Sequence, residues 1–233
     1  MEMPRSLTRH GFFVAGTDTG VGKTFAAVAI IRSLVRAGLA VAGMKPVAAG
    51  AALRASGFRS DDALALAAAA NVKAPYPSVN PYCLKEPVAP HIAANAEGIT
   101  IDVGTIVGEF DTLKAQADCV IVEGAGGWLV PIGNGLSMAD VAVALGLPVV
   151  MVVGLRLGCL NHAALTAQAI TTSRLRLDHW IANEIDPAFA RREENLATLT
   201  DLLGEPLAVL PHARDKKAPD LPPEAATRLA ETL

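Results

Sequence analysis

The stretch Gly16-Thr17-Asp18-Thr19-Gly20-Val21-Gly22-Lys23-Thr24 decides the fold. It follows a short apolar run at residues 12–15 and precedes an alanine-rich segment with the periodicity of an amphipathic helix. A strand, a glycine-rich loop and a helix in this order are typical of a phosphate-binding site, because the N–H groups of the loop and of the first helical turn bind an anion. Lys23 then reaches the terminal phosphates, and the Thr24 hydroxyl binds Mg²⁺.

The spacing departs from the usual pattern of such loops. That pattern places its first glycine five residues before Gly22, where this chain has Thr17, and Gly16 comes one residue earlier. The alternative is an ordinary glycine-rich turn between a strand and a helix. Such a turn does not explain why a lysine and a threonine begin the helix, so we expect phosphate binding.

The composition limits the class of protein. The chain has 233 residues, of which 52% are hydrophobic, enough for a single α/β domain over residues 1–233 with a large core. Only 4% of the residues are aromatic and the net charge is −3, which argues against a nucleic-acid partner.

No targeting or membrane segment is expected. The apolar run after the N-terminus is too short for a signal peptide. The longest apolar stretch, residues 141–155, is broken by Gly146 and Pro148 and falls short of the roughly 18 residues that span a membrane. The three cysteines suggest neither a disulfide framework nor a zinc site. We therefore expect a cytoplasmic protein that does not bind membranes.

Short apolar runs alternate with helical patterns along the chain. The runs predict six buried parallel strands at residues 12–15, 40–44, 119–122, 148–153, 179–182 and 207–210. Helices are expected to begin near residues 22, 61, 101, 137, 160 and 187. The alternation predicts an α/β fold of the P-loop NTPase type, a mostly parallel central sheet with helices on both faces. The proline-rich residues 71–98 predict an irregular segment over the active-site edge.

Candidate functional residues follow the predicted strands. Because ligands bind at the carboxyl ends of parallel strands, these residues are expected to share one edge. After the first strand comes the phosphate loop, and after the other five come, in order, Lys45, then Glu123 with Gly124, Ala125 and Gly126, then Gly154, Asn183 and Pro211.

The charged residues of this edge suggest phosphoryl transfer. Glu123 is placed to bind Mg²⁺, although a plain charged loop residue is the alternative. Asp61 and Asp62 begin a helix, where acidic residues are stabilising in any case, so the pattern leaves open whether one of them is a second metal ligand. Lys45, on the same edge as Lys23, would stabilise charge that develops during transfer, although an ordinary exposed lysine is equally compatible with the pattern.

One further segment could bind an anion. Gly158, Cys159, Leu160 and Asn161 precede a predicted helix, and their N–H groups could bind a carboxylate. The alternative is simple capping of that helix by the Asn161 side chain.

Several motifs together resemble the dethiobiotin synthetase family. They occur in order over about residues 12–213: the phosphate loop, KPVAAG at 45–50, DALAL at 62–66, VNPY at 79–82, EPVAPH at 86–91, VEGAGGW at 122–128, LGCLNH at 157–162 and AN at 182–183. The resemblance implies an ATP-dependent enzyme of biotin synthesis. Its substrates are 7,8-diaminononanoate, CO₂ and MgATP, and its products are dethiobiotin, ADP and phosphate. The intermediates are a carbamate and a carbamic–phosphoric anhydride.

The resemblance also implies roles for single residues. The expected Mg²⁺ ligands are Thr24, Asp62 and Glu123, and the expected catalytic lysines are Lys23 and Lys45. ATP is expected to contact Thr17, Gly20, Val21, Gly22, Lys23, Thr24, Phe25, Asp62, Glu123, Gly124, Ala125, Gly126, Asn183 and Pro211. The segment from Gly158 to Asn161 is expected to bind the substrate carboxylate across the interface of a homodimer.

Two positions depart from the family pattern. Position 49 usually carries a hydroxyl that contacts the diamine, and this chain has Ala49 there. Position 20 is often acidic, and this chain has Gly20. Neither change removes an expected metal ligand or lysine.

Three other functions compete with a synthetase. A partitioning or positioning ATPase acts as a switch and carries a signature lysine at the position of Asp18. An amidoligase of the cobalamin type carries a glutamine-hydrolysing domain, for which we see no room after Pro211. A non-catalytic nucleotide-binding module would not need Lys45.

Overall fold

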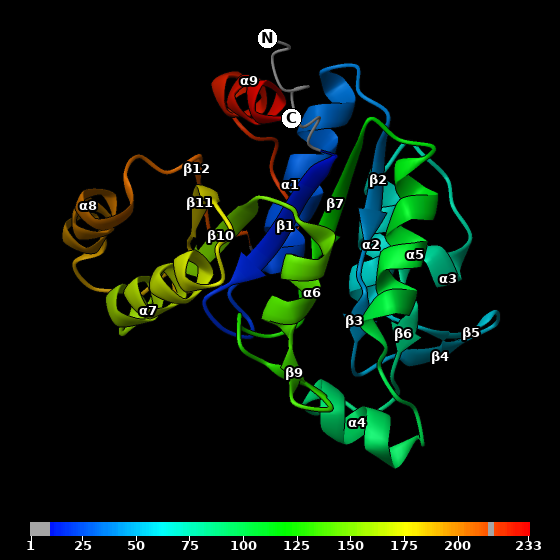
Figure 1. The fold of residues 1–233 in the computed structure, drawn as a ribbon. Coiled ribbons are helices and arrows are strands. Elements are labelled where there is room, and N and C mark those ends of the chain that lie inside the picture. The colour runs from blue at the N-terminus through cyan, green and yellow to red at the C-terminus, as the bar shows by residue number, and fades with distance from the viewer. Residues whose placement is uncertain (1–9, 214–216) are drawn as a thin grey trace, which may run out of the picture.

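A six-stranded parallel sheet forms the centre of the computed structural model, which describes residues 10–213 and 217–233 (Figure 1). Residues 1–9 and 214–216 of the expected domain lie outside the described part. The strands lie in the order β12-β11-β10-β1-β7-β2, and every neighbouring pair is parallel. Their bounds are β1 Gly11–Gly16, β2 Val41–Met44, β7 Cys119–Glu123, β10 Val149–Gly154, β11 Leu177–Asn183 and β12 Ala208–Leu210. All six strands expected from the apolar runs are confirmed.

The central strands are apolar along nearly their whole length because both faces of the sheet are covered, and the charged Glu123 comes only at the end of β7. In β1, Phe12 and Val14 belong to one hydrophobic cluster, whereas Phe13 and Ala15 belong to the other. This alternation follows from the two-residue period of a strand. A continuous apolar run therefore fills two cores at once, which is why the strands showed no polar alternation in the sequence.

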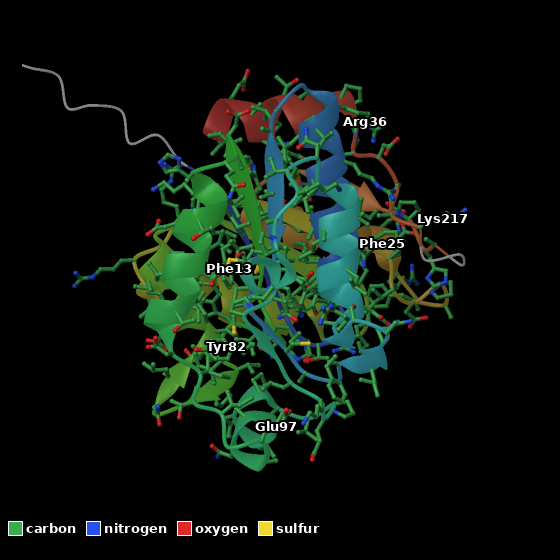
Figure 2. All side chains as sticks on the ribbon, turned by 90° about the vertical axis from the view of Figure 1, so that its right-hand side faces the viewer. Phe13, Phe25, Arg36, Tyr82, Glu97 and Lys217 are labelled. Atoms are coloured by element: carbon green, nitrogen blue, oxygen red, sulfur yellow. The ribbon has the colours of Figure 1, made fainter. Side chains whose placement is uncertain are left out.

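Helices cover both faces, as expected (Figure 2). The face of Phe12 carries α1 (Lys23–Arg36), α2 (Asp61–Ala69) and α9 (Pro223–Thr232). The face of Phe13 carries α5 (Val103–Lys114), α6 (Met138–Leu145), α7 (Cys159–Thr172) and α8 (Arg192–Leu203). No helix in the described ranges is both long enough and apolar enough to cross a bilayer.

Short elements lie at the carboxyl edge of the sheet. They are the parallel pair β3 (Val47–Ala48) and β6 (Tyr82–Cys83), the antiparallel pairs β4 (Ala52–Arg54) with β5 (Gly57–Arg59) and β8 (Pro131–Gly133) with β9 (Leu136–Ser137), and the helices α3 (Tyr76–Val79) and α4 (Pro90–Ala96). The proline-rich segment 71–98 contains α3, β6 and α4, so it is less irregular than expected. A proline lies in the first turn of each helix, where its missing N–H costs nothing.

Two helices begin later than the sequence pattern suggested. The helix expected near residue 101 begins at Val103, because the Asp102 side chain caps it through the N–H groups of Gly104 and Thr105. The helix expected near residue 187 begins only at Arg192. The Asp186 side chain accepts a bond from the Ala188 N–H and forms a turn there, and Arg191 has a left-handed backbone with φ of 55°.

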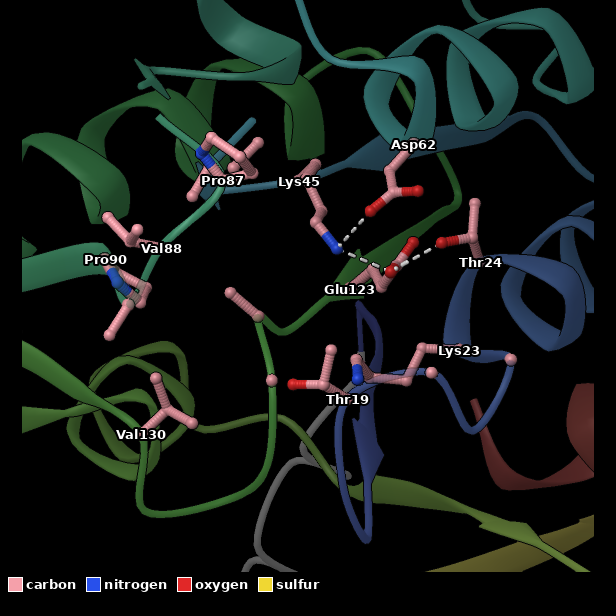
Figure 3. A pocket seen from close by; sticks show the side chains of 17 residues that line it. Thr19, Lys23, Thr24, Lys45, Asp62, Pro87, Val88, Pro90, Glu123 and Val130 are labelled. Atoms are coloured by element: carbon pink, nitrogen blue, oxygen red, sulfur yellow. Dashed lines mark hydrogen bonds and ion pairs between the residues drawn. The ribbon is translucent and has the colours of Figure 1, made fainter. Parts of the chain in front are cut away.

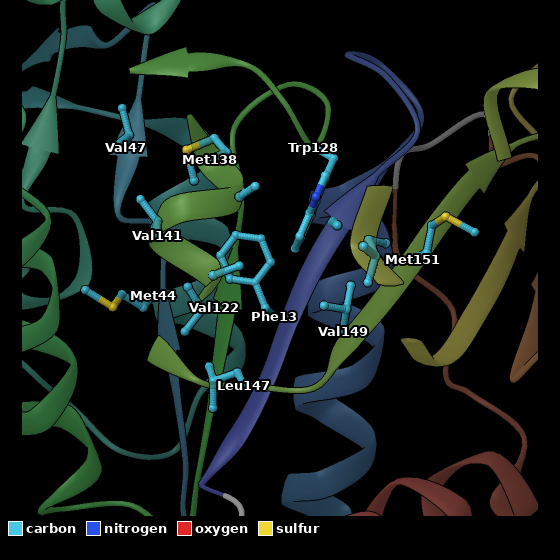
Figure 4. Packing of buried hydrophobic residues seen from close by; sticks show 14 of the residues in the cluster. Phe13, Met44, Val47, Val122, Trp128, Met138, Val141, Leu147, Val149 and Met151 are labelled. Atoms are coloured by element: carbon cyan, nitrogen blue, oxygen red, sulfur yellow. The ribbon is translucent and has the colours of Figure 1, made fainter. Parts of the chain in front are cut away.

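Phe13 lies at the centre of the core beneath the active-site edge (Figure 4). Its ring meets the Trp128 indole edge-on, with centroids 6.0 Å apart and an interplanar angle of 88°. An ideal Cβ built on Gly124, directly after β7, would lie 3.1 Å from the Phe13 ring. The same ring therefore supports both the core and the loop that follows Glu123.

We expect Phe13→Ala to lower the free energy of unfolding by about 3–5 kcal/mol, because it leaves a cavity in a core that cannot collapse fully. Leu53→Ala is the control, since Leu53 is 72% exposed and its loss should cost no more than about 0.5 kcal/mol. Urea unfolding measures both values. Equal destabilisation by the two changes would contradict the central place given to Phe13.

Candidate active site

The phosphate loop is fixed in place by Asn183 at the end of β11. The Asn183 side-chain N–H donates to the carbonyl of Val21 at 2.9 Å, and Asn183 is buried. Gly22, the N-cap of α1, has a φ of 88°, which favours glycine. A Cβ there would lie 2.0 Å from Asn183 Nδ2. The glycine before Lys23 is thus required by backbone conformation and by the close approach of Asn183.

Lys23 is folded back onto its own loop. Its ammonium group donates to the backbone carbonyl of Asp18 at 2.9 Å. Burial, together with the nearby charge of Lys45, lowers the pKa of Lys23 to about 8. The Asp18 carboxylate forms an ion pair with Arg156, which follows β10. An anion bound in the loop would offer Lys23 a charged acceptor in place of this carbonyl.

Lys45 joins the two candidate carboxylates (Figure 3). Its Nζ atom lies 2.5 Å from Glu123 Oε1, 2.9 Å from Asp62 Oδ2 and 3.2 Å from the Gly124 carbonyl oxygen. The Thr24 hydroxyl donates to Glu123 Oε1 at 2.9 Å. The carboxyl ends of β2 and β7 and the first turns of α1 and α2 therefore meet at one cluster, which we call the Lys45 cluster (Thr24, Lys45, Asp62 and Glu123). Lys45 and Glu123 are buried, whereas the Asp62 side chain is 45% exposed.

The electrostatics of the Lys45 cluster favour a charged lysine. Burial alone would lower the pKa of Lys45, but the charges of Glu123 and Asp62 and the bonds to both raise it. Burial likewise opposes ionisation of Asp62, yet the charge and the bond of Lys45 lower the pKa of this carboxyl. Burial raises the pKa of Glu123, and the ammonium of Lys45 opposes this shift. Lys45, which is 3% exposed, is thus held as a cation by its two carboxylate partners.

The same residues fit a magnesium ion. Glu123 Oε2 is buried and has no hydrogen-bond partner in the described structure, so it has a lone pair to offer to a ligand. Two carboxylates and a hydroxyl are ligands that Mg²⁺ prefers, and the ion commonly takes its remaining ligands from phosphate oxygens and water. Among residues 10–213 and 217–233 there is no cluster of three or more His, Cys, Asp or Glu side chains placed to hold a metal. A metal here would therefore depend on a bound nucleotide.

The structure separates Asp61 from Asp62. The Asp61 carboxylate pairs with Arg54 at 2.7 Å, and its side chain is 78% exposed. Asp62, the next residue in the first turn of α2, points toward Lys45. Successive helical residues differ by about 100° in direction, so Asp62 reaches Lys45 whereas Asp61 pairs with Arg54 instead.

Most of the predicted site residues line two adjoining pockets, which share Gly20, Gly22, Thr24 and Asp62. The first pocket, of about 690 Å³, also contains Lys23, Lys45, Ala49, Glu123, Ala125 and Gly126. The second, of about 760 Å³, also contains Phe25, Asn183 and Pro211. The first could hold phosphates and a small substrate, and the second could hold a nucleobase.

Some predicted residues lie outside these two pockets. The Thr17 N–H donates to the Val152 carbonyl at 3.1 Å, and Thr17 lines a separate hollow with Trp128 and Leu165. Val21 is buried and takes part through its carbonyl, and Gly124 contributes the carbonyl that Lys45 contacts. None of the lining residues of either pocket comes from the segment Gly158 to Asn161, at the start of α7.

The expected alternative role of Asn161, capping α7, is wrong. The N-cap of α7 is Gly158, with a φ of 95°, and no side chain caps the helix there. Because α7 begins at Cys159, Asn161 already lies inside its first turn. An N-cap side chain has to precede the helix to reach its free N–H groups.

The sequence did not reveal all of the lining residues. Pro87, Val88, Ala89 and Pro90 form one wall of the first pocket, opposite the phosphate loop (Figure 3). The proline-rich composition predicted a segment over this edge, without indicating which residues face the pocket. The pair between Arg156 and Asp18 joins residues 138 positions apart, and no local pattern signals it.

Comparisons with known proteins identify the family of the chain. The family model described as AAA domain matches residues 10–219. The ATP-dependent dethiobiotin synthetase BioD of Aromatoleum aromaticum is 52% identical over 204 residues, which cover 87% of this chain and 91% of that protein. The protein of the same name from Xanthomonas oryzae pv. oryzae is 49% identical over 195 residues, which cover 84% of this chain and 87% of that one.

Solved structures of low identity share the fold. The cell division protein MinD of Aquifex aeolicus has a TM-score of 0.57 and 17% identity, with 96% of each chain covered. A ParA family ATPase from Chlorobium tepidum has a TM-score of 0.55 and 14% identity, with 89% of this chain and 86% of that chain covered. These are P-loop NTPases, which confirms the expected fold class.

Replacing glycines in the phosphate loop tests the contact between Gly22 and Asn183. We expect Gly22→Ala to lower the stability of the nucleotide-free protein more than Gly20→Ala does. Both positions have left-handed backbones, with φ of 88° and 76°, so both changes cost about 1–2 kcal/mol. A Cβ at Gly20 meets nothing within 4 Å, whereas a Cβ at Gly22 displaces Asn183. Losing that buried bond adds about 1–3 kcal/mol.

Urea unfolding of the two variants measures this difference. If Gly22→Ala and Gly20→Ala are equally destabilising, then Asn183 does not fix the loop.

Proposed function

The chain belongs to the dethiobiotin synthetase family. We propose that its first pocket is the active site, in which CO₂ is bonded to the two amines of 7,8-diaminononanoate at the expense of ATP. The assignment to this family and to its overall reaction rests on the similarity to these relatives. The observation that supports the chemistry of the site is Lys45, a buried cation held between Asp62 and Glu123. It lines the same pocket as the phosphate-loop lysine, Lys23.

ATP would occupy both pockets. Its base would lie in the second pocket near Phe25, Asn183 and Pro211, and its phosphates would lie along Gly20 to Thr24. The backbone N–H groups at the start of α1 and the Lys23 ammonium would bind the phosphate oxygens. Backbone of Gly124, Ala125 and Gly126, directly after β7, would lie on the opposite side.

The first chemical step forms a carbamate. One amine of the substrate attacks the carbon of CO₂ and forms the N–C bond, one C=O electron pair moves onto oxygen, and the nitrogen loses a proton to solvent. The product is an anion that must approach the triphosphate, itself an anion. Lys45 and Lys23 both line the pocket and would reduce this repulsion, because both lysines are buried and their charges are only weakly screened by solvent.

The second and third steps use the phosphate. A carbamate oxygen attacks the γ-phosphorus, and ADP leaves with the electrons of the broken P–O bond. The other amine then attacks the carbonyl carbon of the carbamic–phosphoric anhydride. The C–O bond to phosphate breaks, phosphate leaves with its electrons, the attacking amine loses a proton to solvent, and the cyclic urea closes. The protein's contribution is to hold the reacting groups in line and to stabilise the developing charge.

Thr24, Asp62 and Glu123 would hold a Mg²⁺ ion together with phosphate oxygens. When bound, the ion supplies positive charge that neutralises the phosphates. The unpartnered oxygen of Glu123 is the clearest site for a direct or water-mediated ligand bond.

The substrate's carboxylate would be bound by a second copy of the chain. Gly158, Cys159, Leu160 and Asn161 lie at the N-terminal end of α7, where free N–H groups attract anions, yet they do not line the first pocket. The neighbouring Leu157 is 92% exposed, as expected for a residue that a partner covers. Ala49 lines the first pocket and would contact the diamine without a hydroxyl. We therefore include a homodimer in the proposal.

The state of the cysteines bears on the cellular location. All three cysteines are free thiols, which is compatible with the reducing cytoplasm that we propose as the location.

The likeness to MinD and ParA concerns the fold only. Asp18, at the signature-lysine position of such switch ATPases, is engaged by Arg156, which does not favour that function.

A turnover assay tests the proposed function. We expect phosphate release from MgATP and bicarbonate to require 7,8-diaminononanoate, and dethiobiotin to form in equal amount. Phosphate release that is independent of the diamine, or phosphate without dethiobiotin, would contradict the proposal.

We expect Lys45→Gln to lower kcat at least about tenfold, because it removes a buried charge from the reacting groups. ATP binding, measured by calorimetry, should persist, since the phosphate loop is unchanged. Lys85→Gln is the matched control, because Lys85 pairs with Glu97 and does not line the first pocket. The kcat of this variant should stay near the wild-type value. Wild-type turnover of Lys45→Gln would remove Lys45 from the mechanism.

A further inference from the structure

Tyr76 and Asn80 form a hydrogen-bonded pair behind the Lys45 cluster. They lie at the two ends of α3, the short helix that lies against β2 and α5 (Figure 1). The Tyr76 hydroxyl donates to Asn80 Oδ1 at 2.9 Å, and the Asn80 N–H donates to the Tyr76 carbonyl at 2.8 Å. Neither residue lines the first or the second pocket. They contact the site only through the residues that they hold.

Asn80 holds the backbone of Lys45. The Asn80 side-chain N–H donates to the Lys45 carbonyl at 2.7 Å, and Asn80 is 2% exposed. On the other side of the same residue, the Lys45 N–H donates to the Val79 carbonyl at 2.7 Å. Lys45 comes directly after β2, where the sheet no longer provides these bonds. The end of α3 takes the place of a neighbouring strand at this position.

Tyr76 holds the start of α2. Its hydroxyl accepts a bond from the Ser60 N–H at 2.7 Å. Ser60 is the N-cap of α2, and its side chain accepts from the Ala63 N–H at 3.4 Å. Asp62 lies in the first turn of this helix, two residues after the contact. The position of the Tyr76 hydroxyl therefore influences where the Asp62 carboxylate lies.

These contacts close a ring. One path runs from Ser60 through Tyr76 and Asn80 to the backbone of Lys45. The other path is the 2.9 Å ion pair between Lys45 and Asp62. The Tyr76 hydroxyl is suited to link them because it accepts one bond and donates another. Burial and its bond to Cys83 raise the pKa of Tyr76 to about 12, so it keeps the proton that it donates.

We propose that Tyr76 and Asn80 are positioning residues, which set the distance between Lys45 and Asp62 before the substrates bind. The inference rests on the role proposed above for Lys45. Its physical basis is that a reacting group misplaced by about 1 Å loses much of its effect, so a site needs supporting contacts that fix its geometry. The ion pair alone cannot supply this, because ammonium and carboxylate attract each other in many arrangements.

The chain's two tyrosines provide a matched pair of variants. Tyr82, like Tyr76, accepts a backbone N–H with its hydroxyl, from Asp102 at 2.9 Å, but Asp102 caps α5 rather than α2. We expect Tyr76→Phe to lower kcat about ten- to hundredfold with the KM for ATP nearly unchanged. Tyr82→Phe should change kcat less than about twofold, although it loses two hydrogen bonds with its cap residue, Asp102, and Tyr76→Phe loses one with Ser60.

A double-mutant cycle separates positioning from general weakening. If Tyr76 acts through Lys45, then Tyr76→Phe should lower kcat less than about twofold when Lys45→Gln is already present. A loss as large as in the wild-type background would overturn the proposal, as would wild-type kcat in Tyr76→Phe alone. So would a Tyr82→Phe variant as impaired as Tyr76→Phe.

The last readout does not depend on activity. In a crystal structure of Tyr76→Phe, Lys45 Nζ and Asp62 Oδ2 should no longer lie within ion-pair distance. An unchanged pair would overturn the proposal. If the wild-type enzyme shows no turnover that depends on the diamine, the proposed function fails, and this structure still decides whether Tyr76 positions Lys45.

Discussion

The ammonium group of Lys45, buried between Asp62 and Glu123, is the interaction on which the rest of the site depends. A charge without a partner in this position would be very costly, and a carboxylate left alone would be equally so. Each member of the cluster comes from a different element, so the ends of β2 and β7 and the start of α2 have to meet. The cluster holds three charged groups close together at the carboxyl edge of the sheet.

The fold supplies this meeting point in two ways. Parallel strands bring their carboxyl ends to one edge, so Lys45 and Glu123 arrive together with the phosphate loop after β1. The remaining alignment comes from contacts outside the sheet. Asn183 fixes the loop through Val21, and Asn80 holds the backbone of Lys45 where β2 has ended. The phosphate loop and Lys45 are thus positioned by separate parts of the chain, each of which holds backbone rather than a charged side-chain group.

Much of this arrangement could be predicted from the sequence, because local patterns encode it. The six strands are continuous apolar runs since both faces of the sheet are covered, and the strand ends directly indicated Lys45, Glu123 and Asn183. The choice between Asp61 and Asp62 could not be made from propensity, because either residue stabilises the first turn of α2. It depends on which side of the helix faces Lys45, and only the resemblance to a family anticipated the answer.

What the sequence did not reveal is non-local or depends on a single turn. The pair of Asp18 with Arg156 and the link from Ser60 through Tyr76 to Asn80 join segments that no periodicity connects. The late start of α8 depends on a turn formed by one side chain, that of Asp186. Asn161 resembled a helix cap because the sequence does not show at which residue α7 begins. In the structure Gly158, which has a left-handed backbone, is the N-cap of α7, so Asn161 lies inside the helix and cannot cap it.

In the proposed reaction, the Lys45 cluster serves an anionic carbamate rather than water as the phosphoryl acceptor. Bicarbonate labelled with ¹⁸O tests this most directly, if the reaction is stopped before the label exchanges with solvent. A carbamate oxygen that attacks the γ-phosphorus leaves with the phosphate, so the carbamate route predicts one ¹⁸O atom in each phosphate released in the presence of the diamine. Phosphate that contains no label from bicarbonate would show that water is the acceptor and would contradict the claim.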